Sequence, residues 1–413
     1  MRATSPSLFP SLFLASSVAC ATAACAVACT TTETVYETVP AADAGSGPSN
    51  TDDLDSGAST GDGAVATDAA HAHPTPPPLP VIPNQGGPIL ASPEVITVTW
   101  TGDPLVSALE TFDGWWVTSA TWKTIMAEWG VGPGNYVGAV HLAGAAPQTL
   151  GNDDVDALLR AGFTAGTIPP PNGKRLYMIY PPSGTDVTNF GSKGCETFQA
   201  YHLSVDVAAS DAGAATKAYY AVTPRCANTE GMSPIDFVTW GASHEVMEAA
   251  SDPQFDHPAW RIDVQSPATP ELGENADLCA GHPTVVEGHM ITRNWSNVAA
   301  KAGERPCVPA PPGPMFGLFP DSAEVTLTPG KSSTLKIHAY ASGAIAPFKV
   351  GVFPGDPTLT ASLSAKTAND GDELTLTINP SAQFVEQLGS NLVYLYAQSS
   401  DYSTKRHVIV HSK

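Results

Sequence analysis

The chain has 413 residues, which is enough for two domains and accessory segments. Its formal net charge is −21, from 40 acidic and 19 basic residues, which argues against a nucleic-acid partner. With 38 prolines, 36 glycines and only 14% charged residues, the composition is typical of an exported, loop-rich protein and disfavours a helical cytosolic enzyme.

Residues 1–29 have the pattern of a secretory signal, because Arg2 is the only charge before a long stretch of apolar and small residues. Cys29 follows Ala-Val-Ala, so two outcomes stay open: lipidation of Cys29, as in bacterial lipoproteins, or simple cleavage. Both predict a secreted or cell-surface protein. Lipidation would make it an outer-membrane lipoprotein whose membrane contact is its lipid anchor.

Residues 30–92 are low in complexity. They carry eight acidic residues and no Lys or Arg, and they end in the proline-rich stretch HAHPTPPPLPVIPNQGGP. Such a composition offers little apolar surface to bury and favours extended polyproline conformations. It predicts a disordered acidic and Pro-rich linker.

Residues 93–310 are predicted to form an α+β domain. The β-branched, alternating segment 94–100 predicts a strand. Helices are expected at 104–112, 119–130 and 152–162, the last with Asn152 as its N-cap and Gly162 as its end. Further strands are expected at 174–182, 201–207 and 217–224, and a helix at 233–252.

Four cysteines follow the signal, an even number that predicts two disulfides in an exported protein. Three pairings are open. We expect Cys195–Cys226 and Cys279–Cys307, because each closes a short loop.

Residues 311–413 are predicted to form an all-β, immunoglobulin-like sandwich. Seven short alternating runs are separated by turns, at 323–329, 333–341, 348–354, 359–365, 373–380, 391–398 and 406–412. The segment contains no cysteine, which excludes a disulfide-pinned sandwich. It could contact cell wall or glycan, and a spacer role is equally open.

The central motif is ASHEVMEAASDP at 242–253, which contains the pattern His-Glu-x-x-Glu. Ser233 as N-cap and Pro234 at the first helical position predict where its helix begins, and Asp252-Pro253 predicts where it ends. Side chains four apart on a helix are adjacent, which is how His-Glu-x-x-His holds zinc.

A carboxylate is an accepted zinc ligand, so we expect His244, Glu248 and a downstream Glu274 to hold Zn²⁺ or another divalent cation. Glu245 would act as the general base on a water molecule. Alternative ligands or supporting residues are Asp277, Asp252 and His202.

The motif helix and the later sequence TPELGENADLCAG resemble the EXORDIUM / phosphate-induced protein 1 family of plants and its bacterial relatives. The similarity covers about residues 93–310 and implies an extracellular protein, without implying catalysis. The matching positions are His244, Glu245, Glu248, Asp252, Pro253, Trp260, Glu274, Asp277, Leu278 and Cys279.

Two functions therefore remain. The first is a metallopeptidase-like zinc hydrolase acting on a peptide or protein substrate. The second is a non-catalytic, EXORDIUM-like surface interaction protein that holds a structural metal or none.

Overall fold

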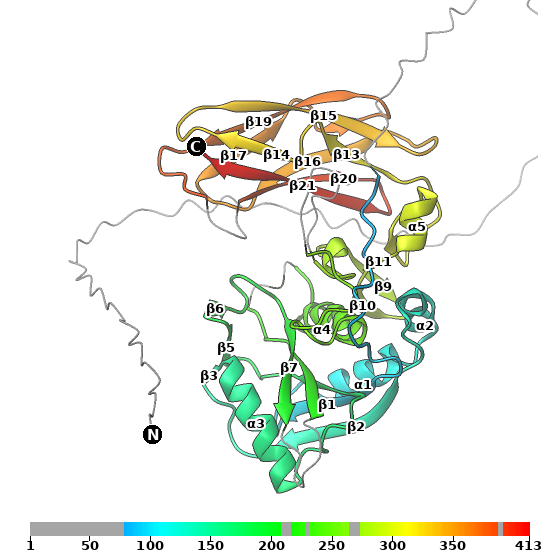
Figure 1. Ribbon diagram of the computed structural model, residues 1–413, viewed down its shortest axis with the longest axis vertical. Coiled ribbons are helices and arrows are strands. Elements are labelled where there is room, and N and C mark those ends of the chain that lie inside the picture. The colour runs from blue at the N-terminus through cyan, green and yellow to red at the C-terminus, as the bar shows by residue number, and fades with distance from the viewer. Residues whose placement is uncertain (1–77, 208–215, 228, 230, 264–272, 387–390) are drawn as a thin grey trace, which may run out of the picture. The chain divides into compact units, whose positions relative to one another are not determined.

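The computed structural model describes residues 78–413 except 208–215, 228, 230, 264–272 and 387–390 (Figure 1). The predicted signal, Cys29 and most of the predicted linker lie outside the described residues. In the part that is described, no helix combines the length and apolarity needed to span a membrane.

The first folded region is built on a five-stranded sheet in the order β2-β1-β4-β8-β7. Strands β1, β2, β4 and β8 are mutually parallel, and β7 pairs antiparallel with β8 at one edge. The strands are β1 (Glu94–Trp100), β2 (Asn135–Leu142), β4 (Arg175–Ile179), β7 (Tyr201–Val207) and β8 (Thr216–Val222). A small second sheet contains β3 (Thr149–Leu150), β5 (Asp186–Asn189) and β6 (Ser192–Lys193).

Helices cover both faces of the main sheet (Figure 1). One face packs against α1 (Val106–Trp116), α2 (Ala120–Met126) and α4 (Pro234–Ser251), and the other against α3 (Asn152–Ala165). Neighbouring residues of β1 show the division, because Val95 belongs to the first core and Ile96 to the second. Both faces of a strand are thus buried, as is usual in parallel sheets.

The mixed helix–strand content agrees with the predicted α+β domain, but the parallel pairing gives it an alternating α/β arrangement. The sequence prediction did not assign a strand to β2, so the β1–helix–β2–α3–β4 alternation was not recognised. The half-buried segment NYVGAVHL contains a glycine and lacks a continuous apolar run, which explains the omission.

The predicted end of α3 at Gly162 is wrong. Gly162 lies inside the helix, where an added Cβ would come within 2.5 Å of Ile168, so its role is close packing. The helix ends at Gly166, which adopts the left-handed conformation with φ 69°. Its N-cap is Gly151, and the predicted cap, Asn152, is the first helical residue.

The predicted linker is too long at its C-terminal end, because part of 78–92 is packed. Ile82 and Leu90 are only 1% and 2% exposed. The Leu90 amide donates to the carbonyl of Ala250 (2.8 Å), and Asn297 bonds both main-chain polar groups of Ile82. These few apolar side chains were hidden among prolines in the sequence.

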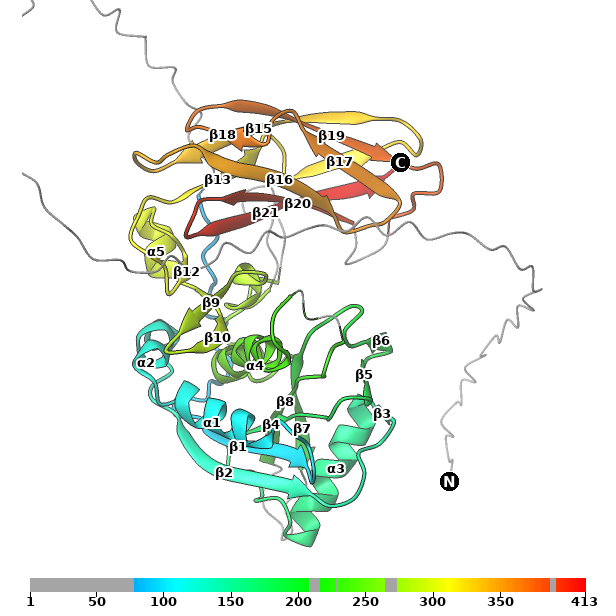
Figure 2. The ribbon, with the colours of Figure 1, turned by 180° about the vertical axis from the view of Figure 1, so that it is seen from behind.

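After α4 the chain forms short elements that cover this helix on the side away from the sheet (Figure 2). A hairpin of β9 (Pro283–Val286) and β10 (His289–Thr292) packs against α4, and the Thr292 amide donates to Ser243 Oγ (2.8 Å). The remaining elements are the 3-10 turns η1 (Ala127–Trp129) and η2 (Asp277–Cys279), α5 (Asn297–Ala302), and the paired strands β11 (Asn294–Trp295) and β12 (Cys307–Val308). Both predicted disulfides, Cys195–Cys226 and Cys279–Cys307, are confirmed.

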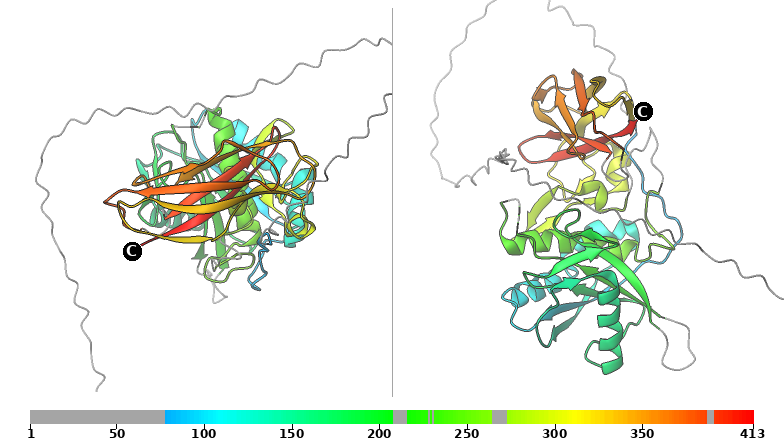
Figure 3. Two further views of the ribbon diagram at one scale, coloured as in Figure 1. Left: turned by 90° about the horizontal axis from the view of Figure 1, so that it is seen from above. Right: turned by 90° about the vertical axis from the view of Figure 1, so that its left-hand side faces the viewer.

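The second folded region is a β-sandwich, whose two layers are visible in Figure 3. One sheet has the order β13-β15-β19-β17 and the other β14-β21-β20-β16-β18. All seven predicted runs are strands, and β13 and β18 are additional. The strands are β13 (Phe316–Pro320), β14 (Glu324–Leu327), β15 (Ser333–Ala341), β16 (Phe348–Pro354), β17 (Leu359–Leu363), β18 (Thr367–Ala368), β19 (Glu373–Pro380), β20 (Leu392–Gln398) and β21 (Ser403–Ser412).

Candidate metal centre

The candidate site is built on α4, whose limits agree with the sequence prediction. Ser233 Oγ accepts a hydrogen bond from the Asp236 amide (3.2 Å), and Pro234 opens the helix. The polar side of α4 is covered as well, by His202 of β7 and by the segment that carries Asp277. Glu245 and Glu248 are each only 4% exposed.

Six side chains from three separate segments converge here, and we call them the α4 cluster. They are His202 from β7, His244, Glu245 and Glu248 from α4, and Glu274 and Asp277 from the loop and 3-10 turn that precede the second disulfide. The motif, His244 to Glu248, is therefore completed by His202, 42 positions before its first residue, and by Glu274 and Asp277, up to 29 positions after its last residue.

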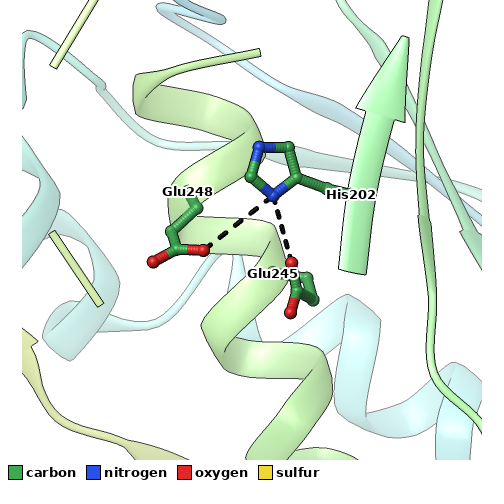
Figure 4. A group of neighbouring side chains, drawn as sticks. All are labelled: His202, Glu245 and Glu248. Atoms are coloured by element: carbon green, nitrogen blue, oxygen red, sulfur yellow. Dashed lines mark hydrogen bonds and ion pairs between the residues drawn. The ribbon is translucent and has the colours of Figure 1, made fainter. Parts of the chain in front are cut away.

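His202 reaches across from β7 to two glutamates of α4 (Figure 4). Its Nδ1 lies 3.0 Å from Glu245 Oε2 and 3.9 Å from Glu248 Oε2. Single ligand atoms of His202, Glu245 and Glu248 all lie within 4.8 Å of one another, close enough to share one cation.

A second triad lies beside the first and shares Glu248. His244 Nε2 is 3.1 Å from Glu248 Oε2 and 3.4 Å from Asp277 Oδ1, and these three residues also meet the 4.8 Å condition. The Asp277 amide donates to Glu248 Oε1 (2.9 Å), which fixes that carboxylate. The side chains of His244 and Asp277 are 16% and 46% exposed, so this triad is the side of the α4 cluster that solvent reaches.

Glu274, the expected third ligand, faces His202 instead of His244. Its Oε2 lies 3.5 Å from His202 Nε2 and has no hydrogen-bond partner among the described residues, although Glu274 is only 8% exposed. Asp252 is the C-cap of α4 and accepts from the Ala259 amide (2.5 Å), so it also anchors the following loop.

Gly273 sets the path of the loop that carries both acidic residues. Its φ is +140°, and a Cβ there would lie 2.5 Å from Asp277 Oδ2. Two main-chain bonds with Ile262 hold Gly273 in place (2.9 and 3.1 Å), and the Glu274 amide donates to Asp277 Oδ2 (3.2 Å). This backbone turn brings Asp277 to the His244 triad, and sequence spacing alone did not reveal it.

The electrostatics of the α4 cluster show an excess of buried acid. Burial would lower the pKa of His202, yet the surrounding carboxylates, Glu274 foremost, raise it to about 10. Burial, reinforced by the charge of Asp277, raises the pKa of Glu248 to about 7. Burial likewise raises the pKa of Glu274 well above its usual value. Protons or a cation must balance these carboxylates.

The donor set fits a divalent cation. Imidazole nitrogen and carboxylate oxygen suit zinc, manganese and iron. For ligands about 2.1 Å from a tetrahedral ion, the distance between ligand atoms is about 3.4 Å. The 3.4 Å separation between His244 Nε2 and Asp277 Oδ1 equals that value, and the 3.1 Å separation from Glu248 Oε2 is shorter and is also a normal hydrogen-bond length. The choice of zinc remains a prediction.

Among the site residues, His202 was expected only as an alternative, and the structure makes it central to the α4 cluster. A lone histidine in the alternating segment YHLSVDV carries no spacing signal. Asp113 was not noted at all. It is a buried acid of α1 whose carboxylate accepts from Thr97 Oγ1 and from the Tyr180 hydroxyl (2.7 Å).

No family model and no curated protein matches the chain. Among solved structures, it is similar to domains 4 and 5 of the S-layer protein SbsC, at 22% identity over 24% of this chain and 54% of that chain (TM-score 0.18). It is also similar to the twitchin kinase region from C. elegans, at 18% identity over 24% of this chain and 16% of that one (TM-score 0.17). Domain 1 of VCBP3 from Branchiostoma floridae is matched at 10% identity over 25% of this chain and 98% of that one (TM-score 0.18). The EXORDIUM resemblance remains a prediction from the sequence.

Proposed function

We propose that this protein is an exported hydrolase that depends on a divalent cation held by His244, Glu248 and Asp277. The observation that carries the proposal is the convergence of these three side chains at ligand-to-ligand distances, with solvent access on their side. Asp277 takes the role expected for Glu274. Zn²⁺ is the cation first expected from the motif, and Mn²⁺ or Fe²⁺ would also suit the oxygen-rich donors.

A cation at this triad would polarise a substrate carbonyl and acidify a water molecule. Glu245 follows His244 directly in α4, and its Oε2 is fixed by the bond to His202 Nδ1 (3.0 Å), so in this proposal Oε1 is the atom that accepts the proton of the water. Glu245 takes the proton as the water oxygen attacks the carbonyl carbon. It then delivers that proton to the leaving nitrogen as the carbon–nitrogen bond breaks.

The substrate class is a peptide or protein. This class is supported by the similarity of the motif to the His-Glu-x-x-His motif of zinc peptidases. In those enzymes the glutamate after the first histidine is the general base, the role proposed here for Glu245. We also propose that the sandwich contacts cell wall or glycan. The two disulfides fit an oxidising compartment and so support secretion, with a lipid on Cys29 as the alternative to release.

The decisive test is Glu245→Gln. Hydrolysis of casein or a peptide library should fall about 10²- to 10⁴-fold, because a general base is lost. The cation content should stay the same at the His244 triad, as measured by elemental analysis. Glu373→Gln, which breaks a surface ion pair of the sandwich, is the matched control and should leave hydrolysis unchanged. Retained hydrolysis in Glu245→Gln would refute the mechanism.

The burial of Glu245 and Glu248 favours a second candidate, a non-catalytic surface protein with a structural cation. In that case Glu245→Gln is silent in every assay, while a chelator still lowers the melting temperature. The two candidates therefore differ in whether peptide hydrolysis accompanies cation binding.

A further inference from the structure

Among the residues that the structure describes, His202 Nε2, on the side of the ring away from Glu245, has two electron-pair acceptors as its polar neighbours. It lies 3.5 Å from Glu274 Oε2 and 3.3 Å from the main-chain carbonyl oxygen of Asp252. Nδ1 is already engaged with Glu245 at 3.0 Å, a normal hydrogen-bond length. Three atoms that carry lone pairs thus converge, and something positive must lie between them.

A proton on Nε2 is one solution, but the distances fit it poorly. Protein N–H···O bonds are about 2.7–3.2 Å long, and bonds to charged partners are shorter. Both separations at Nε2 exceed that range. They match instead the separation of about 3.4 Å between ligands that surround a tetrahedral ion at about 2.1 Å.

Two buried oxygens point to the same ligand. Glu274 Oε2 and Asp252 Oδ2 receive no hydrogen bond from any other group among the described residues, although the two carboxyl groups lie close enough to share one proton, and the two residues are 8% and 1% exposed. An unpaired buried carboxylate oxygen is costly, and the nearest basic group to Asp252 Oδ2 is Arg261 Nη1, at 3.9 Å.

Charge balance supports the same conclusion. The α4 cluster contains four carboxylates, and one divalent cation at the His244 triad leaves two of their charges unbalanced. A second divalent cation beside His202 neutralises the four carboxylates while both histidines stay neutral, as metal ligation requires.

We propose a second divalent-cation site, formed by His202 Nε2, Glu274 Oε2 and the main-chain carbonyl of Asp252. One imidazole and two oxygens suit Mn²⁺ or Zn²⁺. The cation fixes the ring so that Nδ1–H donates to Glu245, the arrangement by which a carboxylate orients a metal-bound histidine. That this cation supports Glu245 as a catalytic base rests on the proposed function. That a cation binds at the second site does not.

The test is the number of ions per chain, measured with Mn²⁺ and Zn²⁺ separately by elemental analysis after dialysis of the full chain. Wild type should hold two ions. Glu274→Gln and Asp277→Asn should each hold one, and the double variant none. His338→Gln, which removes a histidine–aspartate pair of the sandwich, is the control and should hold two.

Anomalous scattering from wild-type crystals keeps the proposal falsifiable if a variant fails to fold. One peak should lie about 2.0–2.2 Å from His202 Nε2 and Glu274 Oε2, and a second at the His244 triad. A single ion at the His244 triad, unaffected by Glu274→Gln, would overturn the second site and leave the proposed function intact. No ion at either place would overturn both.

A catalytic consequence follows for Glu274→Gln. Loss of the support to Glu245 should lower kcat about 10- to 100-fold with little change in KM, as for other residues that orient metal ligands. An unchanged kcat in a variant that has lost one ion would overturn the positioning role.

Discussion

Histidine–carboxylate pairs occur in both folded regions of this chain, in different surroundings. His202 and His244 in the α4 cluster lie 3.0 and 3.1 Å from their nearest carboxylates, and His338 and His411 in the sandwich lie 2.6 and 3.1 Å from theirs. Exposure separates them, at 13% and 16% in the cluster against 23% and 37% in the sandwich. Their carboxylate partners differ more, at 5–6% against 37–47%.

The comparison shows that pair distance alone does not identify a functional site. Solvent screens the sandwich pairs, so each is expected to contribute little to stability. In the α4 cluster the carboxylates of Glu245, Glu248 and Glu274 are desolvated, and Asp277 is half-exposed. The four carboxylates outnumber the two histidines. Burying such charges without a counter-charge is strongly unfavourable, so we expect a cation in this region and not in the sandwich.

The largest effect is expected from replacing Glu248, the buried carboxylate that the His202 and His244 triads share. This change tests whether the α4 cluster binds a cation that the sandwich does not bind. In wild type, Mn²⁺ or Zn²⁺ at about 1,000 times its dissociation constant should stabilise the fold by about 4 kcal/mol for each ion bound. Glu248→Gln should abolish the part of this gain that comes from the His244 triad while leaving the metal-free protein equally or more stable, because one buried charge is removed. Thermal melts with and without metal measure both quantities.

Glu386→Gln, which removes the partner of His411 in the sandwich, is the matched control and should keep the full metal-induced stabilisation. An undiminished metal effect in Glu248→Gln would show that this carboxylate is not a ligand.

Asp113 of α1 shows what burial alone does to a carboxylate, because its hydrogen-bond partners among the described residues are the uncharged side chains of Thr97 and Tyr180. Burial raises the pKa of Asp113 to about 7. Asp113 therefore keeps its proton in the folded state at pH values where the unfolded chain has lost it. The resulting stabilisation of the folded state is complete below about pH 4 and is lost as the pH rises to about 7. At about 1.36 kcal/mol per pKa unit, the loss is roughly 4 kcal/mol.

Asp113→Asn removes this titration. Urea unfolding at pH 5 and pH 8 should show a flatter pH dependence than wild type, with the variant gaining most at pH 8. An unchanged slope between these pH values would mean that Asp113 is ionised in the folded protein.

Removing each disulfide in turn tests whether the second one supports cation binding. The two bridges close loops of similar length, so their loss should cost similar stability. Their cysteines are 31 and 28 residues apart, so each should contribute about 3.5 kcal/mol. Of the four cysteines, Cys279 is the one next to the segment that carries Glu274 and Asp277, and it lies two residues after Asp277. Replacing Cys279 and Cys307 by Ser should weaken cation binding about tenfold in titration calorimetry, whereas replacing the other pair should leave affinity unchanged. Equal changes in affinity would contradict a local role for the second bridge.

The smallest effect is expected in the sandwich. His338→Gln breaks the pair with Asp321, whose side chain is 47% exposed, and should change the free energy of unfolding by less than about 1 kcal/mol. Chemical denaturation at low and high salt measures it. A loss of several kcal/mol would show that the contrast between the two regions is wrong.

What the sequence could predict is what local chemistry decides. Ser233 and Pro234 define the start of α4, and the four-residue spacing places His244 beside Glu248. Alternating runs identify the strands of the sandwich, because one face of each is buried and the other is solvated.

The remainder depends on long-range packing. His202 reaches the site because β7 is the edge strand next to β8, and no local pattern encodes that neighbour. The choice of Asp277 over Glu274 for the His244 triad depends on the backbone turn at Gly273. Parallel strand order also escaped prediction, since β2 was not assigned: its half-buried segment contains a glycine and lacks a continuous apolar run.

The packed segment before β1 has a practical consequence for handling this protein. The Leu90 amide is bonded to Ala250 in the last turn of α4, and the Gln85 amide to Ala259 (2.7 Å), whose own amide is held by Asp252. A shortened chain that starts at Pro93 would lose both attachments, and the end of the motif helix would be free to unwind. Expression boundaries should therefore begin no later than residue 78, so that the bonds of Gln85 and Leu90 to the end of the motif helix and the loop after it are kept.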